Sequence, residues 1–371
     1  MRTQLLRRFN PMHYLIYQED RIFPIDGMPV SKKRRGLLFT SVGLIIFLVY
    51  LAYSNPFSVL MEVGRFDPWI FAMAVLVNYV GLFFFSASWY LLLRALGVGI
   101  GVWESVQSMF ISLFVVWLVP IPMGTEIIRA YLVKDEENSD MGKAIASVVV
   151  HKAYYNIAFG LLIALGALMV TVFRGGPIPV RPELVFFVIV FAAVSSVIYG
   201  LFLNPSLLMT VYHRSPDWVR RNVFDRMVDS RMRERGFPAV IEEIDSAVRS
   251  LMARPLNNFA SILMVAFHWS TGSLTAYMVA LSLGTPIDFW VIVLIYALIE
   301  FIQQLNVFIP GGLGIIDASL TGAFVLLGVP LSLASAISLL TRLATYWFEL
   351  ILCALVSLRY GYKESLKELL Q

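Results

Sequence analysis

The sequence predicts an all-α polytopic membrane protein, built as an inverted repeat of span, span, re-entrant hairpin and span. Three observations lead to this fold class. First, 58% of the 371 residues are apolar and only 15% are charged, whereas soluble domains average roughly 45–50% apolar and about 25% charged residues. Second, the chain holds about six full spans and two further apolar regions that are broken by Pro or Gly. Third, Lys and Arg gather in three segments, which sets an orientation.

The composition excludes whole classes of protein. A mean hydropathy of +0.75 leaves too little polar surface for a soluble enzyme or a nucleic-acid-binding module of this size. The single cysteine, Cys353, excludes an intramolecular disulfide and a cysteine-based metal site. The first long apolar run begins only at about Gly36, behind a basic segment. We therefore expect a first helix that anchors the chain and no cleaved signal peptide.

Six apolar runs are long enough to span a bilayer, because a transmembrane helix needs about 20 residues to cross roughly 30 Å of hydrocarbon. These runs are 36–54, 69–97, 143–173, 182–212, 256–283 and 330–359. Two further regions, 103–134 and 289–328, also begin apolar. The first of them is interrupted by prolines and then becomes polar, and the second is interrupted by Pro310 and three glycines.

Positive charges predict the side of the membrane for each loop, because Lys and Arg favour cytoplasmic loops. The N-terminal segment 1–35, the amphipathic loop 213–255 and the tail 360–371 are rich in them. We therefore expect these three segments, and both termini, on the cytoplasmic side of a cell membrane. Any two of these cytoplasmic segments must then be separated by an even number of membrane crossings. This parity requires residues 103–134 and 289–328 each to form a re-entrant hairpin or a closely paired broken helix.

The two breaks are similar in sequence, which predicts an internal repeat. The shared frame is I-P-x-G-x-x-I-I-[R/D]-A-x-L, which starts at Ile121 in the first break and at Ile309 in the second. The parity places the two halves, residues 36–173 and 182–359, in opposite orientations. Inverted repeats whose discontinuous helices meet near the midplane are typical of secondary transporters. The alternative is chance similarity, because Ile, Ala, Leu and Gly are common in this chain.

The same residues resemble a known family. Residues 119–129, V-P-I-P-M-G-T-E-I-I-R, resemble the P-x-x-x-G-E-x-x-R element of the lysylphosphatidylglycerol synthase transmembrane region, also called the flippase-like domain. Residues 309–314, I-P-G-G-L-G, are similar to its second element, and the resemblance covers roughly residues 36–359. The chain departs from the family pattern at Thr125, which separates the Gly from the Glu, and at His151-Lys152, where the family often has Glu-Arg.

The resemblance implies a lipid transporter. The family's best-known members flip an aminoacylated phospholipid, and archaeal relatives are associated with polyprenyl-phosphate-linked sugars. The bacterial synthase also carries a soluble aminoacyl-transferase domain after its membrane part. Only a short tail follows Arg359 here, so we expect the membrane part without that enzyme.

Three cations inside the predicted membrane region are candidates for binding an anionic headgroup: Arg129, Lys152 and Arg342. Charges at bilayer depth are costly and face cavities or partners. Lys152 and Arg342 lie well inside their spans, so we expect them to line a cavity that receives an anion. Arg129 can bind a phosphate through its guanidinium fork. Alternatively, Glu126 lies three residues before Arg129 and can neutralise it on one helix face.

The half-helices that begin near Gly124 and Gly312 add a second anion-binding feature, because helix N-termini attract phosphate. Plain kinks are the alternative. Glu300 and Gln303 share a helix face, which predicts a polar cavity or, alternatively, interhelical hydrogen bonds. Asp317 is expected to be an ion-pair partner or a proton or cation site. We predict no catalytic set, no cofactor and no metal site.

Three functions remain to be weighed. The first is a lipid transporter that moves an anionic headgroup through a polar cavity. Its partner is then that membrane lipid, and both a monomer and a homo-oligomer are compatible with the sequence. The second is a secondary transporter of a small anionic solute on the same plan. The third is a membrane enzyme that acts on a lipid-linked substrate. It is disfavoured because the loop 54–68 offers only Glu62 and Asp67 and no D-x-D motif.

Overall fold

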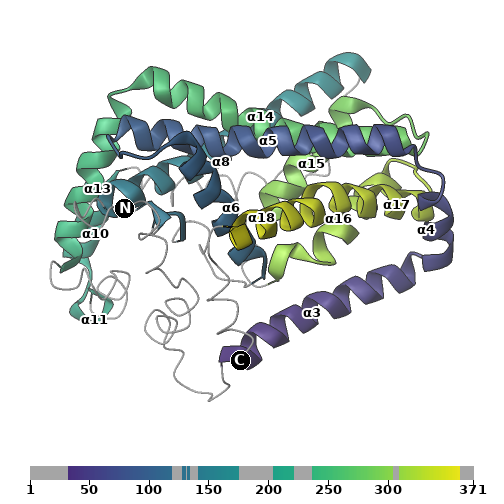
Figure 1. Ribbon diagram of the computed structural model, residues 1–371, viewed down its shortest axis with the longest axis horizontal. Helices are drawn as coiled ribbons and strands as arrows, with labels where there is room; N and C mark the ends of the chain where they lie inside the picture. Colours follow the sequence, from purple (N-terminus) through teal and green to yellow (C-terminus); the bar gives the residue numbers. More distant parts are fainter. Residues whose placement is uncertain are drawn as a thin grey trace.

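The computed structural model describes residues 32–118, 128–130, 132–133, 141–174, 204–220, 236–303 and 309–359. Every regular element within these residues is a helix. Figure 1 shows two long helices, α5 (Pro68–Ala95) and α14 (Pro255–Ser282), side by side along the molecule, and α3 (Lys32–Tyr53) at its edge. The all-α prediction is therefore confirmed for the described residues.

Four helices of the described residues are long and apolar enough to cross a membrane. These are Pro68–Ala95, Gly142–Val172 within α8 (Met141–Arg174), Pro255–Ser282 and Leu331–Arg359. A bent pair, Ser41–Tyr53 with α4 (Pro56–Val63), brings the number to five if it counts as one span. Residues 182–203 of the predicted run 182–212 lie outside the described residues. The last part of this run lies in α10 (Pro205–Arg214). The protein is thus a multi-pass membrane protein.

The segment 54–68, which the sequence predicts to be a loop, contains the helix α4 instead. The chain bends by 81° between α3 and α4. Asn55 adopts a left-handed conformation with φ of 57°, and its side chain accepts a hydrogen bond from the amide of Ser58 at 3.4 Å. Pro56 follows at the first helical position, where its missing N–H costs nothing. Asn55, which makes the turn, and Pro56, which starts a helix, therefore produce a new helix rather than a loop.

Helices α5 and α14 run antiparallel and in close contact. Ser261 donates to the carbonyl of Ser88 at 3.1 Å, and Thr275 donates to the carbonyl of Ala74 at 3.2 Å. The later residue of α14 thus contacts the earlier residue of α5, which shows that the two helices run in opposite directions. Small side chains along both helices allow the backbones to approach, as in other membrane helix pairs.

The turns that follow α5 and α14 have the same construction. Both helices contain 28 residues, and each leads through a short turn to a shorter apolar helix, α6 (Val102–Leu118) or α15 (Phe289–Gln303). Gly97 has φ of 75° in the first turn, and Gly284 has φ of 68° in the second. In the first turn, the amide of Val98 donates to the carbonyl of Leu93 at 3.0 Å. In the second turn, the amide of Thr285 donates to the carbonyl of Ala280, also at 3.0 Å. This is the hydrogen bond of a glycine-terminated helix.

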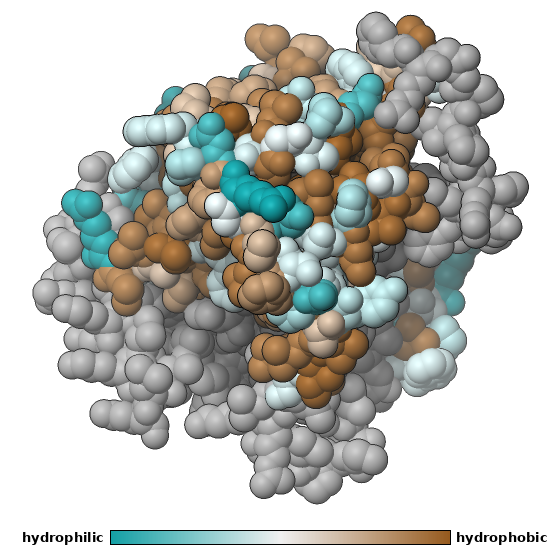
Figure 2. Space-filling model, turned by 90° about the vertical axis from the view of Figure 1, so that its right-hand side faces the viewer, coloured by the Kyte–Doolittle hydropathy of each residue, from teal (hydrophilic) through white to brown (hydrophobic). Residues whose placement is uncertain are grey.

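The turns gather at two ends of the bundle. Ile287 and Val329, from the turns around 283–288 and 327–330, pack with Phe66 in one apolar cluster near α4. Figure 2 views this end, where hydrophilic residues lie among hydrophobic ones on the surface. The helices α15 and α16 (Ile315–Leu326) both contribute to the cluster, so the chain enters and leaves at the same end through residues 289–328.

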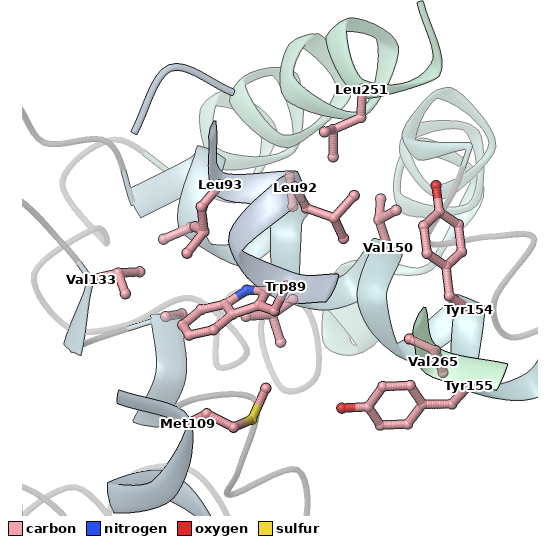
Figure 3. Close-up of a cluster of buried hydrophobic side chains, with 14 of the residues drawn as sticks. Trp89, Leu92, Leu93, Met109, Val133, Val150, Tyr154, Tyr155, Leu251 and Val265 are labelled. Atoms are coloured by element: carbon pink, nitrogen blue, oxygen red, sulfur yellow. The ribbon is translucent and has the colours of Figure 1, made fainter. Parts of the chain in front are cut away.

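The opposite end holds the second apolar cluster. Trp89 and Leu93 of α5 contact this cluster together with Met109 of α6 and Val133 (Figure 3). The helix α6 starts at this end, and Val133 packs in the same cluster after the undescribed stretch 119–127. Met109 before that stretch and Val133 after it therefore pack in the same cluster.

The predicted amphipathic loop 213–255 packs on the bundle rather than only on a membrane surface. Its described parts are the end of α10, the short α11 (Asp217–Val219) and α13 (Gly236–Met252). Val248 and Leu251 of α13 are buried in the cluster around Trp89. Glu243 accepts a hydrogen bond from the amide of Gly142 at 3.0 Å and so caps the start of α8.

Candidate functional site

A first polar cluster surrounds Arg129, whose side chain is completely buried. Its Nη1 donates to Nδ1 of His151 at 2.9 Å, and its guanidinium lies 5.2 Å from the ring centroid of Trp89. Nη1 also lies 3.7 Å from the sulfur of Met109. These described contacts are neutral groups, which hold the guanidinium in place by hydrogen bonding and by a cation–π interaction.

The hydrogen bonds of this cluster have a fixed direction. Because a guanidinium can only donate, Nδ1 of His151 is an acceptor, and Nε2 carries the proton. Nε2 therefore donates to Oγ of Ser88 at 2.5 Å, and Ser88 donates in turn to the carbonyl of Phe85 at 2.7 Å. Although Ser88 and His151 are at the distance of a Ser–His catalytic pair, His151 cannot accept the serine proton in this arrangement. The chain of donors positions Arg129 instead of activating a nucleophile.

Lys152 belongs to the same region. Its backbone follows His151 in α8, its side chain is half-buried, and its ammonium lies 5.1 Å from the ring centroid of Tyr155. His151 interacts electrostatically with both Arg129 and Lys152. The structure therefore brings two of the three predicted headgroup cations together around His151.

A second polar cluster surrounds Arg342 at the end of α17 (Leu331–Arg342), the first part of the last span. Its Nε lies 3.7 Å from Oδ1 of Asp317, and both side chains are buried. Its Nη2 donates to the carbonyl of Gly311, and its guanidinium lies 4.5 Å from the ring centroid of Tyr346. The pair joins the last span to the half-helix α16 (Ile315–Leu326).

Asp317 also accepts a hydrogen bond from a backbone amide at the N-terminus of α16. Its Oδ2 accepts a hydrogen bond from the amide of Gly314 at 2.9 Å. Its carbonyl accepts a hydrogen bond from Oγ of Ser338 at 2.9 Å. The sequence predicts that this half-helix end attracts a phosphate. In the structure, the carboxylate of Asp317 lies where that anion would interact with the amide and with Arg342.

The backbone conformation of the Pro-Gly break before α16 requires glycine at three positions. Gly311, Gly312 and Gly314 have φ of 55°, 63° and 78°, which side chains disfavour. Gly311 and Gly312 belong to the short η2 (Pro310–Gly312). A Cβ on Gly311 would lie within 2.3 Å of the ring of Tyr346. The loop therefore permits both the close approach of Tyr346 and the carbonyl contact to Arg342.

The last span contains a π-helical turn, η3 (Leu343–Trp347), directly after Arg342 and before α18 (Phe348–Arg359). A π turn leaves backbone carbonyls without their usual helical partners. Asn78 of α5 donates to the carbonyl of Ala344 at 3.4 Å, and Tyr79 donates to the carbonyl of Phe348 at 3.0 Å. Two side chains of α5 thus compensate for the irregular turn.

Two further carboxyl groups lie near this turn. Glu349 is 6% exposed, and its Oε1 accepts a hydrogen bond from Nδ2 of Asn78 at 2.5 Å. Glu300 of α15 is partly buried and interacts electrostatically with Arg342 and with Glu349. Gln303, one turn after Glu300, has a buried Oε1 that lacks a hydrogen-bond partner among the described residues. The second cluster therefore combines one guanidinium with three carboxyl groups.

The predicted site residues thus divide between the two clusters. Arg129 and Lys152 lie in the first cluster, whereas Arg342, Asp317, Glu300 and Gly312 lie in or beside the second. Gly124 and Glu126 lie outside the described residues. In the part of the chain that the structure describes, no group of three or more His, Cys, Asp or Glu residues is arranged to hold a metal ion.

Sequence reasoning did not identify Asn78 or Ser88 as members of these clusters. Asn78 is an isolated polar residue within the long apolar run 69–97, and this isolation is the signal that could have found it. Ser88 follows Ser86 in the same run and is not singled out in this way. The π-helical turn has no such signal, because its sequence continues the apolar pattern of the span.

Comparison with known proteins agrees with this architecture. The family described as Lysylphosphatidylglycerol synthase TM region matches residues 40–353. A UPF0104 membrane protein of Methanothermobacter thermautotrophicus is 22% identical over 319 residues, which cover 85% of this chain and 92% of that protein. A second one from the same organism is 23% identical over 333 residues, or 87% and 93% of the two chains. A UPF0104 membrane protein of Pyrococcus horikoshii is 20% identical over 328 residues, or 87% and 96%.

Proposed function

Because the chain belongs to the lysylphosphatidylglycerol synthase TM region family, we propose that it is a lipid transporter of the flippase type. It moves an anionic lipid headgroup, or a headgroup linked to polyprenyl phosphate, across the cell membrane. The observation that carries the proposal is the buried guanidinium of Arg342 beside the interrupted helix at Pro310–Gly314. A cation at this depth is costly unless it serves a partner or a transported group.

The proposed mechanism is alternating access by an inverted repeat. The matching turns after α5 and α14, the antiparallel contact of these helices and the return of residues 289–328 to the end at which they begin support such a repeat of residues 36–173 and 182–359. In transporters of this plan, one repeat moves against the other around a site near the midplane. The Lys and Arg residues of the N-terminal segment 1–35 and of the loop 213–255 support a cytoplasmic location for both termini.

The headgroup would exchange with Asp317. A phosphate that approaches Arg342 meets the carboxylate that already lies 3.7 Å from the guanidinium and caps α16. Phosphate and carboxylate are both recognised by a guanidinium, so the two anions compete for the same donors. Arg129 and Lys152 would receive the headgroup at the other end of its path.

An apolar groove favours a lipid over a small solute. The groove lies between α5 and α14, has a volume of about 310 Å³ and is lined by Leu76, Val77, Val80, Phe267, Ser270, Thr271, Leu274 and Phe289. The hydroxyls of Ser270 and Thr271 donate to carbonyls of their own helix, so the groove offers no free donor. Such a lining suits an acyl or prenyl chain and does not suit a small polar anion.

Reconstitution tests the function directly. The purified protein is placed in vesicles that contain fluorescent phosphatidylglycerol or a fluorescent polyprenyl phosphate, and the fraction protected from an external quencher is followed over time. Wild type should exchange lipid between leaflets, Arg342→Ala should not, and the exposed Arg65→Ala should resemble wild type. Uptake of inorganic phosphate without movement of either lipid would favour a solute transporter.

A further inference from the structure

We propose that Glu349 is a proton-binding site within the membrane and that its protonation couples lipid movement to a proton gradient. The coupling step rests on the proposed transport function. The proton site itself rests on the composition and geometry of the second cluster and can be tested without any lipid substrate.

The first argument is the charge balance of the second cluster. It contains the carboxyl groups of Asp317, Glu300 and Glu349 but only one cation, Arg342. Arg342 is already engaged with Asp317 and with the carbonyl of Gly311. Full ionisation would therefore leave two negative charges without a cation among the described residues. A carboxylate that cannot pair in a low-dielectric interior takes up a proton instead.

The groups that face Glu349 contribute no further cation. The helices packed around it present neutral or acidic groups apart from Arg342: Asn78, Tyr79, Tyr296, Glu300 and Cys353. The helix α6, which also packs on α18, has Glu104 in its first turn as its sole charged residue. The stretch 304–308, which lies outside the described residues, contains neither Lys nor Arg.

The second argument is the hydrogen bond of Glu349. Its partner Asn78 is a neutral amide that donates to Oε1. This contact persists whether the other oxygen carries a proton or not, so the proton can come and go without loss of the helix packing. Tyr296 is the hydrogen-bonding neighbour of the Glu300 carboxyl. Glu300 is more exposed than Glu349, which assigns the site to Glu349.

A third observation is a buried hydroxyl beside Arg342. The hydroxyl of Thr341, next to Arg342, is completely buried and has no hydrogen-bond partner among the described residues. Buried hydroxyls without protein partners are the places where ordered water is expected.

The coupling follows from competition for one guanidinium. When the Glu349 carboxylic acid releases its proton to water, the carboxylate that remains attracts Arg342 and weakens the contact of Arg342 with Asp317. When Glu349 takes up a proton again, Arg342 returns to Asp317. The headgroup, which also competes with Asp317, would bind preferentially in one of these two states.

Infrared difference spectroscopy during a pH titration tests the proton site. The protein in nanodiscs of phosphatidylcholine should show the carbonyl stretch of a protonated carboxylic acid, and Glu349→Gln should lose this band. The variant keeps an oxygen that can accept from Asn78, and size-exclusion chromatography checks its fold. Glu104→Gln, in the exposed first turn of α6, is the matched control and should retain the band. A spectrum without the band in wild type, or with an unchanged band in Glu349→Gln, would overturn the proposal.

The coupling is tested in vesicles that contain fluorescent phosphatidylglycerol. An imposed pH gradient should shift the distribution of this lipid between leaflets for wild type, and the shift should vanish for Glu349→Gln. Lipid movement that ignores the gradient in wild type would overturn the coupling. If wild type moves neither phosphatidylglycerol nor polyprenyl phosphate while the infrared band behaves as expected, the proposed lipid transport fails and the proton site stands.

Discussion

Arg342 lies 3.7 Å from Asp317, and this contact connects the last span to the half-helix that follows the Pro-Gly break. Both side chains are buried, with 8% and 2% of their surfaces exposed. Removal of one partner from a buried pair typically costs about 3–5 kcal/mol, because the other charge remains without compensation. The contact therefore contributes to stability and, at the same time, occupies the cation that the proposed function needs.

Substitution Asp317→Asn should strengthen anion binding. Asn can still cap α16, but it no longer competes for Arg342. We expect the affinity for glycerol phosphate, measured by calorimetry on the purified protein, to rise about tenfold, which corresponds to about 1.4 kcal/mol. Asp288→Asn is the control, since Asp288 caps α15 by accepting from Trp290 and Val291. Equal affinities of wild type and Asp317→Asn would contradict the competition.

The cations should be needed for transport and dispensable for insertion. We expect Lys152→Gln and Arg342→Gln to reach the membrane but to lose lipid movement in the vesicle assay. Arg342→Gln leaves Asp317 buried without its cation, so its unfolding temperature should fall. The double variant Asp317→Asn/Arg342→Gln should recover stability but not transport. Normal transport in the double variant would remove Arg342 from the mechanism.

Gly311→Ala should destabilise the protein strongly. Its φ of 55° costs an alanine roughly 1–2 kcal/mol, and the new Cβ would collide with the ring of Tyr346. Gly322 lies within α16 and has open space around it, so Gly322→Ala should raise stability by about 0.5–1 kcal/mol. Thermal unfolding in detergent followed by light scattering measures both. Similar shifts for the two variants would contradict the packing at the break.

Cysteine labelling should reveal the topology. In a Cys353→Ser background, cysteines at Ser139 and Ser246 should react with an impermeant reagent from the cytoplasmic side, and a cysteine at Gly175 should react from outside. Ser246 lies on an exposed face of α13. Labelling of Ser139 from outside would mean that residues 103–134 cross the membrane completely, and the inverted repeat would then fail.

Ser88 should not react as a nucleophile. Because Nε2 of His151 donates to Oγ of Ser88, the serine lacks a base, and it should remain unmodified by a fluorophosphonate probe. Mass spectrometry of the treated protein measures this, with a serine hydrolase in the same sample as the positive control. Covalent modification at Ser88 would support a membrane enzyme instead.

Part of this architecture was predictable from the sequence because it depends on local properties. The lengths of the apolar runs predict α5, α8, α14 and the last span, since about 20 residues are needed to cross the hydrocarbon. The glycines at 311–314 predict the break, because a backbone with positive φ excludes most side chains. The resemblance in the two Pro-Gly elements identified the family.

The sequence by itself determined that this is a helical, multi-pass membrane protein with cations in its apolar interior. Only the tertiary structure decided which groups meet them. Asn78 and Glu349 are separated by 271 positions, and no local pattern specifies the rotation that brings their side chains together. The same holds for His151, whose accepting nitrogen is fixed by Arg129 22 positions away. Hydrophobicity is additive along a chain, whereas an ion pair or a hydrogen bond depends on distances that packing alone sets.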